Sequence, residues 1–234
     1  MKSNLEKEVV LVIAAHPDDE VLGCGATLAR HAHHGDDVHV VILAEGVTSR
    51  DDLRSREARE GELSDLARSA RSANDTLSVT SLSLLNFPDN RMDSIDLLEI
   101  VKTIESYIDQ YHPTTVYTHH AGDVNIDHRK IHEAVIAACR PLPGHSVKRL
   151  LFFEIPSSTE WQPPGSSIPF LPNWFVDVSG FLPLKLKALN EYTSELRDWP
   201  YPRSLKAVEY LSRWRGASVG CEAAEAFILG RNIV

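Results

Sequence analysis

Short apolar runs alternate with amphipathic helical segments up to residue 155, and this alternation constrains the fold more than any other feature of the sequence. The predicted strands are residues 9–15, 37–45, 82–87, 114–119 and 149–155. The predicted helices are residues 21–34, 53–75, 95–111 and 127–139. Strands that alternate with helices of this length predict βαβ units and therefore a doubly wound, mostly parallel α/β sheet.

The sequence changes character after residue 155. Residues 156–174 are rich in proline and serine and predict an irregular loop. The elements expected beyond this loop are one strand and two amphipathic helices, at residues 174–178, 184–196 and 203–215. Because no repeat and no flexible linker separates the two parts, we expect residues 1–234 to form one domain, with a core at 1–155 and a loop-and-helix cap at 156–234.

Composition and charge limit the classes of function. The net charge of -9 disfavours nucleic acid as a partner, because phosphate binding requires a basic surface. No apolar run reaches the length of about 18 residues that a membrane span requires. The apolar residues 9–15 run directly into acids, so they are interpreted as a strand and not as a secretory leader. The odd number of cysteines, 3, and their wide spacing argue against a disulfide framework and predict a cytoplasmic location.

Polar side chains follow the carboxyl ends of three predicted strands. The sequence HPDDE, residues 16–20, follows the first strand, Arg91 follows the third, and the segment 119–128 follows the fourth. Doubly wound sheets bind their ligands beyond the carboxyl ends of the strands. We therefore expect these loops to meet at one edge of the sheet and to form the functional site.

Two of these loops carry side chains that suit a divalent metal ion. His16 and Asp19 lie close together at a strand-to-helix corner, and His128 lies in the first turn of the helix predicted after the fourth strand. Two histidines and one carboxylate leave a coordination position open, which is typical of catalytic zinc. Such an ion lowers the pKa of bound water to about 7, and Asp18 is placed to act as general base. The crowding of adjacent acids is explained if one binds the cation and another handles a proton.

Other interpretations of these residues stay open. Asp127 is expected to cap the helix that it begins, to orient a metal ligand, or to do both. His128 and His132 form an HxxxH pair that is an alternative ligand set, although it leaves out the acids of the first loop; His132 is otherwise a packed neighbour. Two histidines and one carboxylate also describe non-haem iron(II) enzymes. The sequence GCGATL, residues 23–28, resembles a dinucleotide fingerprint, but the acids at 18–20 would repel a pyrophosphate.

The motifs together resemble those of a known family. HPDDE directly after the first strand, with DH after the fourth, is similar to the pattern of the N-acetylglucosaminyl-phosphatidylinositol deacetylases, also called the LmbE-like or PIG-L family. The resemblance covers about residues 8–155 and extends more loosely to AEAF near the end of the chain. It implies a Rossmann-like fold, a zinc ion and hydrolysis of an N-acetyl group on an amino sugar. It also implies that His16, Asp19 and His128 bind the metal, with Asp18 as the base.

One position departs from the family pattern. Many members carry a histidine three residues before the ligand histidine, where this sequence has Asn125. An amide donates a hydrogen bond to an oxyanion but cannot deliver a proton by titrating. Asn125 is therefore predicted to act only as a donor, and the general acid is Asp18, His119 or His120.

Substrate binding is assigned to the same edge of the sheet. Arg91, in the turn FPDNRMD, is predicted to bind substrate hydroxyls or a phosphate, and His120 is a second candidate. The family places an arginine of its second helix near the substrate, and both Arg56 and Arg59 match that description. Aromatic residues of the cap are expected to cover the site with faces that suit a sugar ring: Trp161, Phe170 and Trp174.

These observations predict a metal-dependent hydrolase that removes an N-acetyl group from a small-molecule amino sugar, free or within a nucleotide sugar or glycoconjugate. Zn²⁺ is the expected cofactor, and iron(II) would fit the same ligands. Asp18, Asn125 and Asp127 are the predicted catalytic residues. The alternatives are hydrolysis of a different amide, an iron(II) enzyme with the same ligands, and a sugar-binding module without activity. A homo-oligomer is compatible with the sequence.

Overall fold

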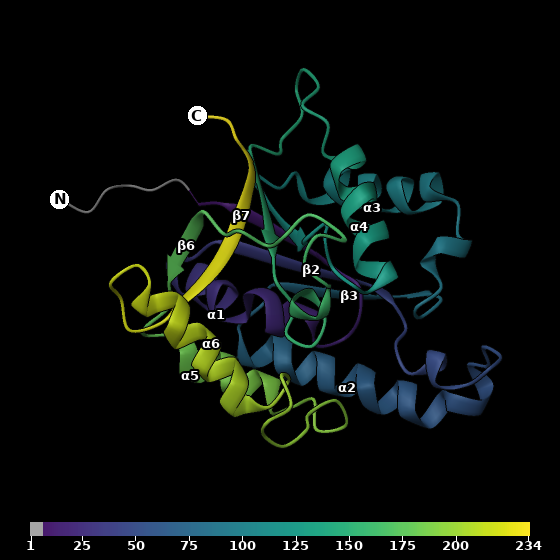
Figure 1. Ribbon diagram of the computed structural model, residues 1–234. Coiled ribbons are helices and arrows are strands. Elements are labelled where there is room, and N and C mark those ends of the chain that lie inside the picture. Colours follow the sequence, from purple (N-terminus) through teal and green to yellow (C-terminus); the bar gives the residue numbers. More distant parts are fainter. Residues whose placement is uncertain (1–6) are drawn as a thin grey trace.

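Five parallel strands and two antiparallel ones form a single sheet in the computed structural model of the protein, which describes residues 7–234 (Figure 1). The strand order is β3-β2-β1-β4-β5-β7-β6. The strands are β1 (Val9–Ala14), β2 (Asp37–Ala44), β3 (Ser81–Phe87), β4 (Thr115–His119), β5 (Arg149–Phe153), β6 (Trp174–Asp177) and β7 (Ala224–Asn232).

The direction of the strands confirms the predicted doubly wound, mostly parallel α/β sheet. β1 to β5 run parallel, β7 runs antiparallel to β5, and β6 runs antiparallel to β7. β7 is an addition to the prediction, because Glu225, which is buried, and Gly230, which is exposed, interrupt its apolar pattern. Residues 156–234 therefore contribute two strands to the sheet besides the predicted cap.

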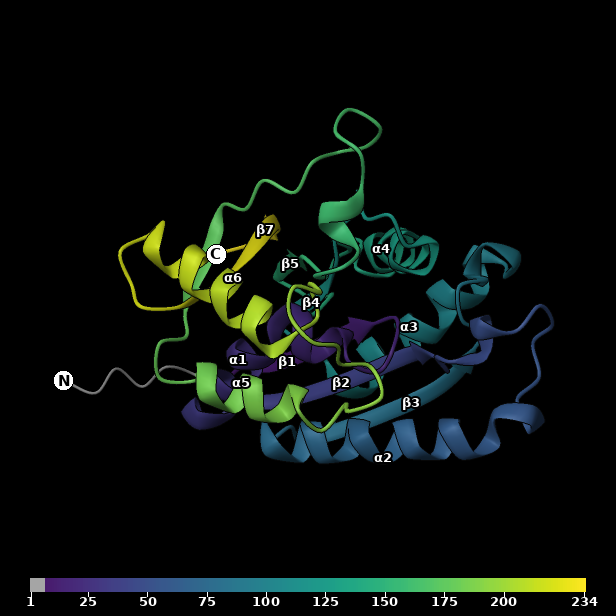
Figure 2. The ribbon, with the colours of Figure 1, turned by 60° about the horizontal axis from the view of Figure 1, so that its bottom comes forward.

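Helices cover both faces of the sheet. The helices are α1 (Asp19–His34), α2 (Glu60–Thr76), α3 (Leu97–Tyr111), α4 (Ile126–Ala138), α5 (Leu182–Leu189) and α6 (Leu205–Ala217). Short 3₁₀ helices lie at Thr48–Arg50, Glu57–Arg59, Met92–Ser94 and Thr159–Trp161. Helices α1, α2, α5 and α6 pack on one face, and α3 and α4 pack on the other (Figure 2).

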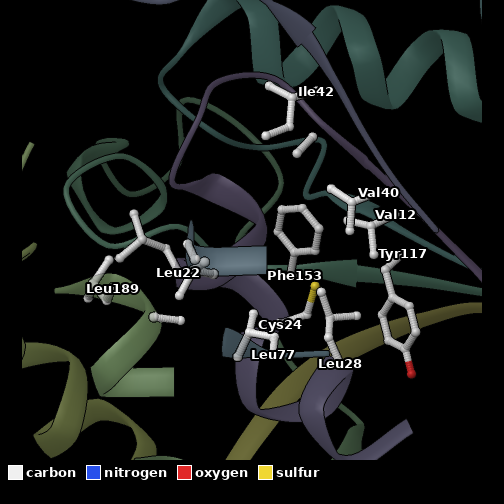
Figure 3. Close-up of a cluster of buried hydrophobic side chains, with 14 of the residues drawn as sticks. Val12, Leu22, Cys24, Leu28, Val40, Ile42, Leu77, Tyr117, Phe153 and Leu189 are labelled. Atoms are coloured by element: carbon white, nitrogen blue, oxygen red, sulfur yellow. The ribbon is translucent and has the colours of Figure 1, made fainter. Parts of the chain in front are cut away.

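The central strand β1 shows why the sheet is apolar throughout. Val10 and Val12 join the core beneath α1, whereas Leu11 and Ile13 join the core beneath α3 and α4. Successive side chains of a strand point to opposite faces, so a strand covered on both faces must be a continuous apolar run. The first of these cores includes Val12, Leu28 and other side chains drawn in Figure 3.

Helix boundaries depart from the predicted ones where side chains make long-range contacts. The helix predicted at 53–75 begins only at Glu60, because Arg54 donates to both oxygens of Glu45 at 2.7 and 2.9 Å and holds the preceding segment against the end of β2. The helix predicted at 184–196 ends at Leu189. Tyr192 lies just beyond it, fully buried, and its hydroxyl donates to the Glu20 carboxylate.

Helix α1 is broken at Cys24, whose backbone angles (φ -148°, ψ 17°) are not helical. A buried ion pair fills the break, with the Lys185 Nζ 2.6 Å from Glu225 Oε1. Lys185 donates to the Leu22 carbonyl at 2.8 Å, and the two oxygens of Glu225 accept from the backbone N–H groups of residues 26 and 27 at 3.1 and 2.7 Å. The pair thus replaces the helical hydrogen bonds that the kink removes.

The centre of the sheet positions the site. The strand order reverses between β1 and β4, so the chain leaves these two neighbouring strands toward opposite faces. A crevice forms beyond the carboxyl ends of strands at such a point, and ligands of doubly wound sheets bind there. Within residues 7–234, the structure contains no helix that is both long and apolar enough to cross a bilayer.

Candidate active site

The corner between β1 and α1 is tightly folded around its own carboxylates. The backbone N–H of His16 donates to Asp19 Oδ2 at 2.9 Å, and that of Asp18 donates to Glu20 Oε2 at 3.1 Å. Asp18 adopts a left-handed backbone conformation (φ 116°), which is unfavourable for a residue with a Cβ atom. Unfavourable backbone geometry of this kind occurs preferentially at functional sites, where the surroundings enforce it.

The start of α4 corrects one prediction. The N-cap is Asn125 and not Asp127, since Asn125 has extended backbone angles and its side-chain oxygen accepts from the Asp127 N–H at 2.8 Å. The Asp127 carboxylate instead faces the β1 corner, 3.0 Å from His16 Nε2, and accepts from the backbone N–H of Met92 at 2.9 Å. Asp127 is therefore placed to orient His16, the second role considered for it.

The structure brings His16, Asp19 and His128 together. Asp19 Oδ2 lies 3.3 Å from His16 Nδ1 and 3.2 Å from His128 Nε2. One ligand atom from each of the three residues lies within 4.8 Å of the others, which is close enough for all three to contact one metal ion. Among residues 7–234, no group with this spacing contains His132, whose Nδ1 contacts the His119 carbonyl at 2.9 Å.

A second group, His16 with Asp89 and Asp127, also has ligand atoms within 4.8 Å of one another. Its carboxylates are already satisfied: Asp127 accepts from two backbone N–H groups, and Asp89 Oδ2 accepts from the Ser49 N–H at 3.0 Å. In the first group, Asp19 Oδ1 and His128 Nε2 are buried without a hydrogen-bond partner among residues 7–234. Buried polar atoms rarely stay unpaired, so the first group is the one that fits a cation.

The charges of the site depend on one another. Burial alone would raise the pKa of Asp19, but the charge of the neighbouring His128 and the contact with His16 hold it well below its usual value. Burial alone would lower the pKa of His128, but the carboxylates of Asp19 and Asp123 raise it to about 9. The buried acids therefore require a positive charge beside them, which is a proton on imidazole when no metal ion is bound.

Asp18 differs from its neighbour Asp19. Burial raises the pKa of Asp18 to about 8, even though the Arg203 guanidinium opposes this shift and donates to Asp18 Oδ2 at 2.9 Å. Asp18 Oδ1 is buried without a partner in the described part of the chain. The pKa values of the two adjacent carboxyl groups are thus shifted in opposite directions. This is the arrangement expected of a metal ligand beside a proton acceptor.

A cavity of about 130 Å³ lies over this corner. Its lining includes His16, Asp18, Asp89, Asn125 and Arg203. Arg50 also lines it and pairs with Glu195 at 2.9 Å. The predicted metal corner, the predicted base and the predicted amide donor therefore face one space.

Comparisons with known proteins decide the family. The sequence matches the family described as PIG-L, GlcNAc-PI de-N-acetylase, over residues 11–139. It is 30% identical over 200 residues to YaiS of Escherichia coli (strain K12), an uncharacterized deacetylase, and the match covers 83% of this chain and 95% of that protein. The chain belongs to the PIG-L family. The resemblance found in the HPDDE and DH motifs is thereby confirmed, and the protein is a member of a family of deacetylases.

Several solved structures share the fold over nearly the whole length of this chain. The conserved protein TT1542 from Thermus thermophilus is 25% identical, with a TM-score of 0.74 over 96% of this chain and 95% of that one. N,N'-diacetylchitobiose deacetylase from Pyrococcus horikoshii is 20% identical, with a TM-score of 0.76 over 97% and 85% of the two chains. GalB, a 4-carboxy-2-hydroxymuconate hydratase from Pseudomonas putida KT2440, is 22% identical, with a TM-score of 0.72 over 97% and 98%.

The histidines proposed as alternative acids lie outside the cavity of this PIG-L protein. His119 is fully buried, accepts from the Ala15 N–H at 2.8 Å and stacks on His128 at a centroid distance of 3.9 Å. His120 Nε2 contacts the Ile168 carbonyl at 2.9 Å and so joins the segment before α4 to the proline-rich loop. Of the three candidate acids, only Asp18 lines the cavity.

Arg91, which was predicted to bind substrate, and the two arginines that match the family's second-helix arginine make contacts elsewhere. Arg91 donates to the backbone carbonyl of Asp52 at 3.0 Å, and its side chain is not part of the cavity lining within residues 7–234. Arg56 pairs with Glu45 at 3.3 Å, and Arg59 makes two hydrogen bonds to Asp51. None of these three residues is among those of the described chain that line the cavity.

The aromatic side chains expected to cover the site are also dispersed. Trp161 is 52% exposed and packs edge-to-face against Tyr201, and Phe170 packs against His120. Trp174 lies beneath the Arg149 guanidinium at 5.4 Å. The cavity lining within the described residues includes none of the predicted aromatic rings.

Two residues that the sequence did not single out complete the site. Asp123 Oδ2 lies 3.2 Å from His128 Nδ1 and also accepts from the Thr159 hydroxyl at 2.7 Å, so it orients the imidazole. Arg203 reaches Asp18 from the cap. Asp123 could have been recognised as a candidate from its position shortly before the DH motif, but no local feature of the sequence marks Arg203.

Proposed function

We propose that the protein is a metal-dependent hydrolase that removes an N-acetyl group from an amino sugar. The observation that carries this proposal is the pair of unpartnered buried atoms, Asp19 Oδ1 and His128 Nε2 (unpartnered among residues 7–234), in a group that His16 connects to the cavity. Membership of the PIG-L family and the similarity to YaiS support deacetylation. The name of the Pyrococcus horikoshii neighbour supports an N-acetyl sugar as the substrate.

The residues that would hold the ion are His16, Asp19 and His128. Zn²⁺ is the proposed ion, and iron(II) fits the same donor set. When bound, the ion polarises the acetamide carbonyl and lowers the pKa of a water molecule to about 7. Asp127 and Asp123 then act through the ligands, because each carboxylate contacts the second ring nitrogen of a ligand histidine, at 3.0 and 3.2 Å.

Asp18 is the proposed proton carrier. It takes a proton from the attacking water as the carbon–oxygen bond forms, and it gives this proton to the nitrogen as the carbon–nitrogen bond breaks, so that acetate and the amine leave. Its raised pKa, about 8, suits a group that must hold a proton between the two steps. Arg203 fixes one carboxylate oxygen, which leaves Oδ1 for the proton.

Asn125 is proposed to bind the carbonyl oxygen of the acetamide. Its Oδ1 is occupied by the Asp127 N–H, and its Nδ2 donates to Asn90 Oδ1 at 2.9 Å. An amide nitrogen carries two hydrogens, so one remains for a developing oxyanion. This role matches the predicted donor that does not titrate.

The cavity suits a neutral head group. Its two guanidinium groups are each paired with an acid, Arg203 with Asp18 and Arg50 with Glu195, both at 2.9 Å. A sugar with hydroxyl and acetamide groups fits such a lining better than a phosphate does. Whether the sugar is free or part of a nucleotide sugar or glycoconjugate, and whether Arg91 and His120 contact it, stays a prediction.

Acetate release tests the proposal. We expect zinc-loaded protein to release acetate from at least one member of a panel of N-acetyl amino sugars and nucleotide sugars under anaerobic conditions, which excludes an oxygenase. Asp18→Asn should lower kcat by about 10²–10⁴, because it removes the proton carrier. The control is Asp109→Asn on the exposed face of α3, which should leave kcat unchanged. Equal turnover by both variants, or no acetate from the whole panel, would overturn the proposal.

A further inference from the structure

A second, larger cavity lies next to the candidate active site. It has a volume of about 400 Å³ and lies between α2 and the edge strand β3. Three leucine side chains on this face of the sheet line it: Leu63, Leu66 and Leu84. It shares Pro17 and Leu66 with the active-site cavity, so these two side chains lie on the boundary between the two cavities.

The rim of this cavity carries positive charge that the chain does not neutralise. Arg71 lines the cavity and donates to the Ala67 carbonyl of its own helix at 3.2 Å, but no carboxylate within residues 7–234 pairs with it. Arg56 shares Glu45 with Arg54, which makes the shorter contact, 2.7 Å against 3.3 Å. This contrasts with the active-site cavity, where each arginine has its own acid. A guanidinium group without a paired acid, as that of Arg71 is within residues 7–234, attracts an anion.

We propose that this cavity binds the aglycone of the amino-sugar substrate, and that the aglycone is an apolar chain or ring with a carboxylate at its far end. The inference rests on the proposed function, since the acetamide is placed in the neighbouring cavity. The substituent passes Pro17 and Leu66, its apolar part contacts the leucines, and its carboxylate pairs with Arg71.

The shape and chemistry of the cavity favour this occupant over others. A leucine-lined cleft excludes a second polar sugar, whose hydroxyl groups would lose their hydrogen bonds to water. Arg71 is preferred over Arg56 as the anion partner, because Glu57 and Glu60 lie beside Arg56 at the opposite end of the cleft. A second copy of the chain is the competing occupant, and oligomeric state together with glycoside preference distinguishes it from an aglycone.

The test compares three glycosides of N-acetyl-β-D-glucosamine that carry a methyl, an octyl or a 7-carboxyheptyl group. We expect kcat/KM to be about tenfold or more higher for octyl than for methyl, from burial of the chain. The carboxylate should raise kcat/KM by about a further threefold at low salt. This gain should disappear at high salt, because the ion pair with Arg71 is partly exposed. Arg71→Gln should remove only the carboxylate gain, and Leu63→Ser should reduce the octyl gain.

The control is Arg68→Gln, which changes an exposed arginine of the same helix that pairs with Asp65 outside the cavity. This variant should have the same kcat/KM as the wild type for all three glycosides. The inference would be overturned if kcat/KM for the three glycosides agreed within twofold, or if Arg71→Gln and Arg68→Gln changed kcat/KM equally. A change of oligomeric state in Leu63→Ser without any change in glycoside preference would assign the cleft to a second copy of the chain, which also overturns it.

Binding of octanoate, measured by calorimetry, separates this inference from the proposed function. We expect wild-type protein to bind octanoate at least threefold more tightly than Arg71→Gln does. If no sugar releases acetate but octanoate binding depends on Arg71, the proposed function and the aglycone assignment both fail, and the cavity is then a site for an apolar carboxylate that is not part of a sugar substrate. If acetate is released and octanoate binding is identical in the two proteins, the cavity assignment fails alone.

Discussion

The two parts of helix α1 both carry buried charges, but only one part has them fully paired. At the kink, Lys185 and Glu225 satisfy each other and the backbone groups released by the broken helix. At the first turn, Asp18 Oδ1 and Asp19 Oδ1 are buried and have no partner within residues 7–234. Because buried polar atoms rarely stay without a partner, the comparison supports the proposed cation at the start of the helix and gives no such support at the kink.

The largest expected effect on stability concerns the kink. Glu225→Gln leaves the Lys185 charge buried without its partner and should lower the free energy of unfolding by about 3–5 kcal/mol. The neutral double variant Lys185→Met/Glu225→Gln should recover most of this loss. Urea denaturation of the metal-free protein measures both. The control Glu222→Gln alters an exposed acid and should cost less than about 0.5 kcal/mol. A loss of under about 1 kcal/mol in the single variant would remove the contrast between the two parts of the helix.

A smaller effect is expected from the metal itself. Zn²⁺ at 100 times its Kd should raise the free energy of unfolding of the wild type by about 2.7 kcal/mol, since it binds only the folded state. Asp19→Asn should abolish the rise, and Glu225→Gln should retain it despite its lower baseline stability. Thermal and urea unfolding with and without Zn²⁺ supply the comparison. An equal rise in Asp19→Asn would place the ion at a different site.

The smallest effect is a pH dependence at His132. Burial lowers the pKa of His132 below 6.5, so the imidazole is neutral in the folded state and takes up a proton more readily in the unfolded chain. The contribution of neutral His132 to the free energy of unfolding is complete above pH 6.5. It is lost as the pH falls below that value, by at most about 1.4 kcal/mol per pH unit. The free energy of unfolding of His132→Asn should therefore fall less between pH 7.5 and 5.5 than that of the wild type. The exposed His34→Asn is the control, and identical slopes for His132→Asn and wild type would contradict the assignment.

Features set by local periodicity were predictable, and features set by long-range contacts were not. The five parallel strands follow from apolar runs, and the meeting of His16, Asp19 and His128 follows from loops at one edge of a parallel sheet. The contact between Asp18 and Arg203 joins residues 185 positions apart, and nothing near Arg203 in the sequence indicates it.

The remaining differences have the same origin. β7 contains Glu225, which the sequence alone suggests is a surface acid. The structure shows that it is buried against partners in α1 and α5. The cap of α4 is Asn125 because its side chain reaches the Asp127 N–H, while Asp127 is drawn toward His16. In each case a distant partner decides what a polar side chain does.

The central claim is that the first turn of α1 and the start of α4 hold one metal ion. The most direct measurement is the metal content of protein that has been stripped with chelator, dialysed against buffered Zn²⁺ and separated from free metal, for wild type, Asp19→Asn and Glu225→Gln. We predict one ion per chain in the wild type and in Glu225→Gln, and a loss of binding in Asp19→Asn. Equal metal content in wild type and Asp19→Asn, or no metal in the wild type, would contradict the account.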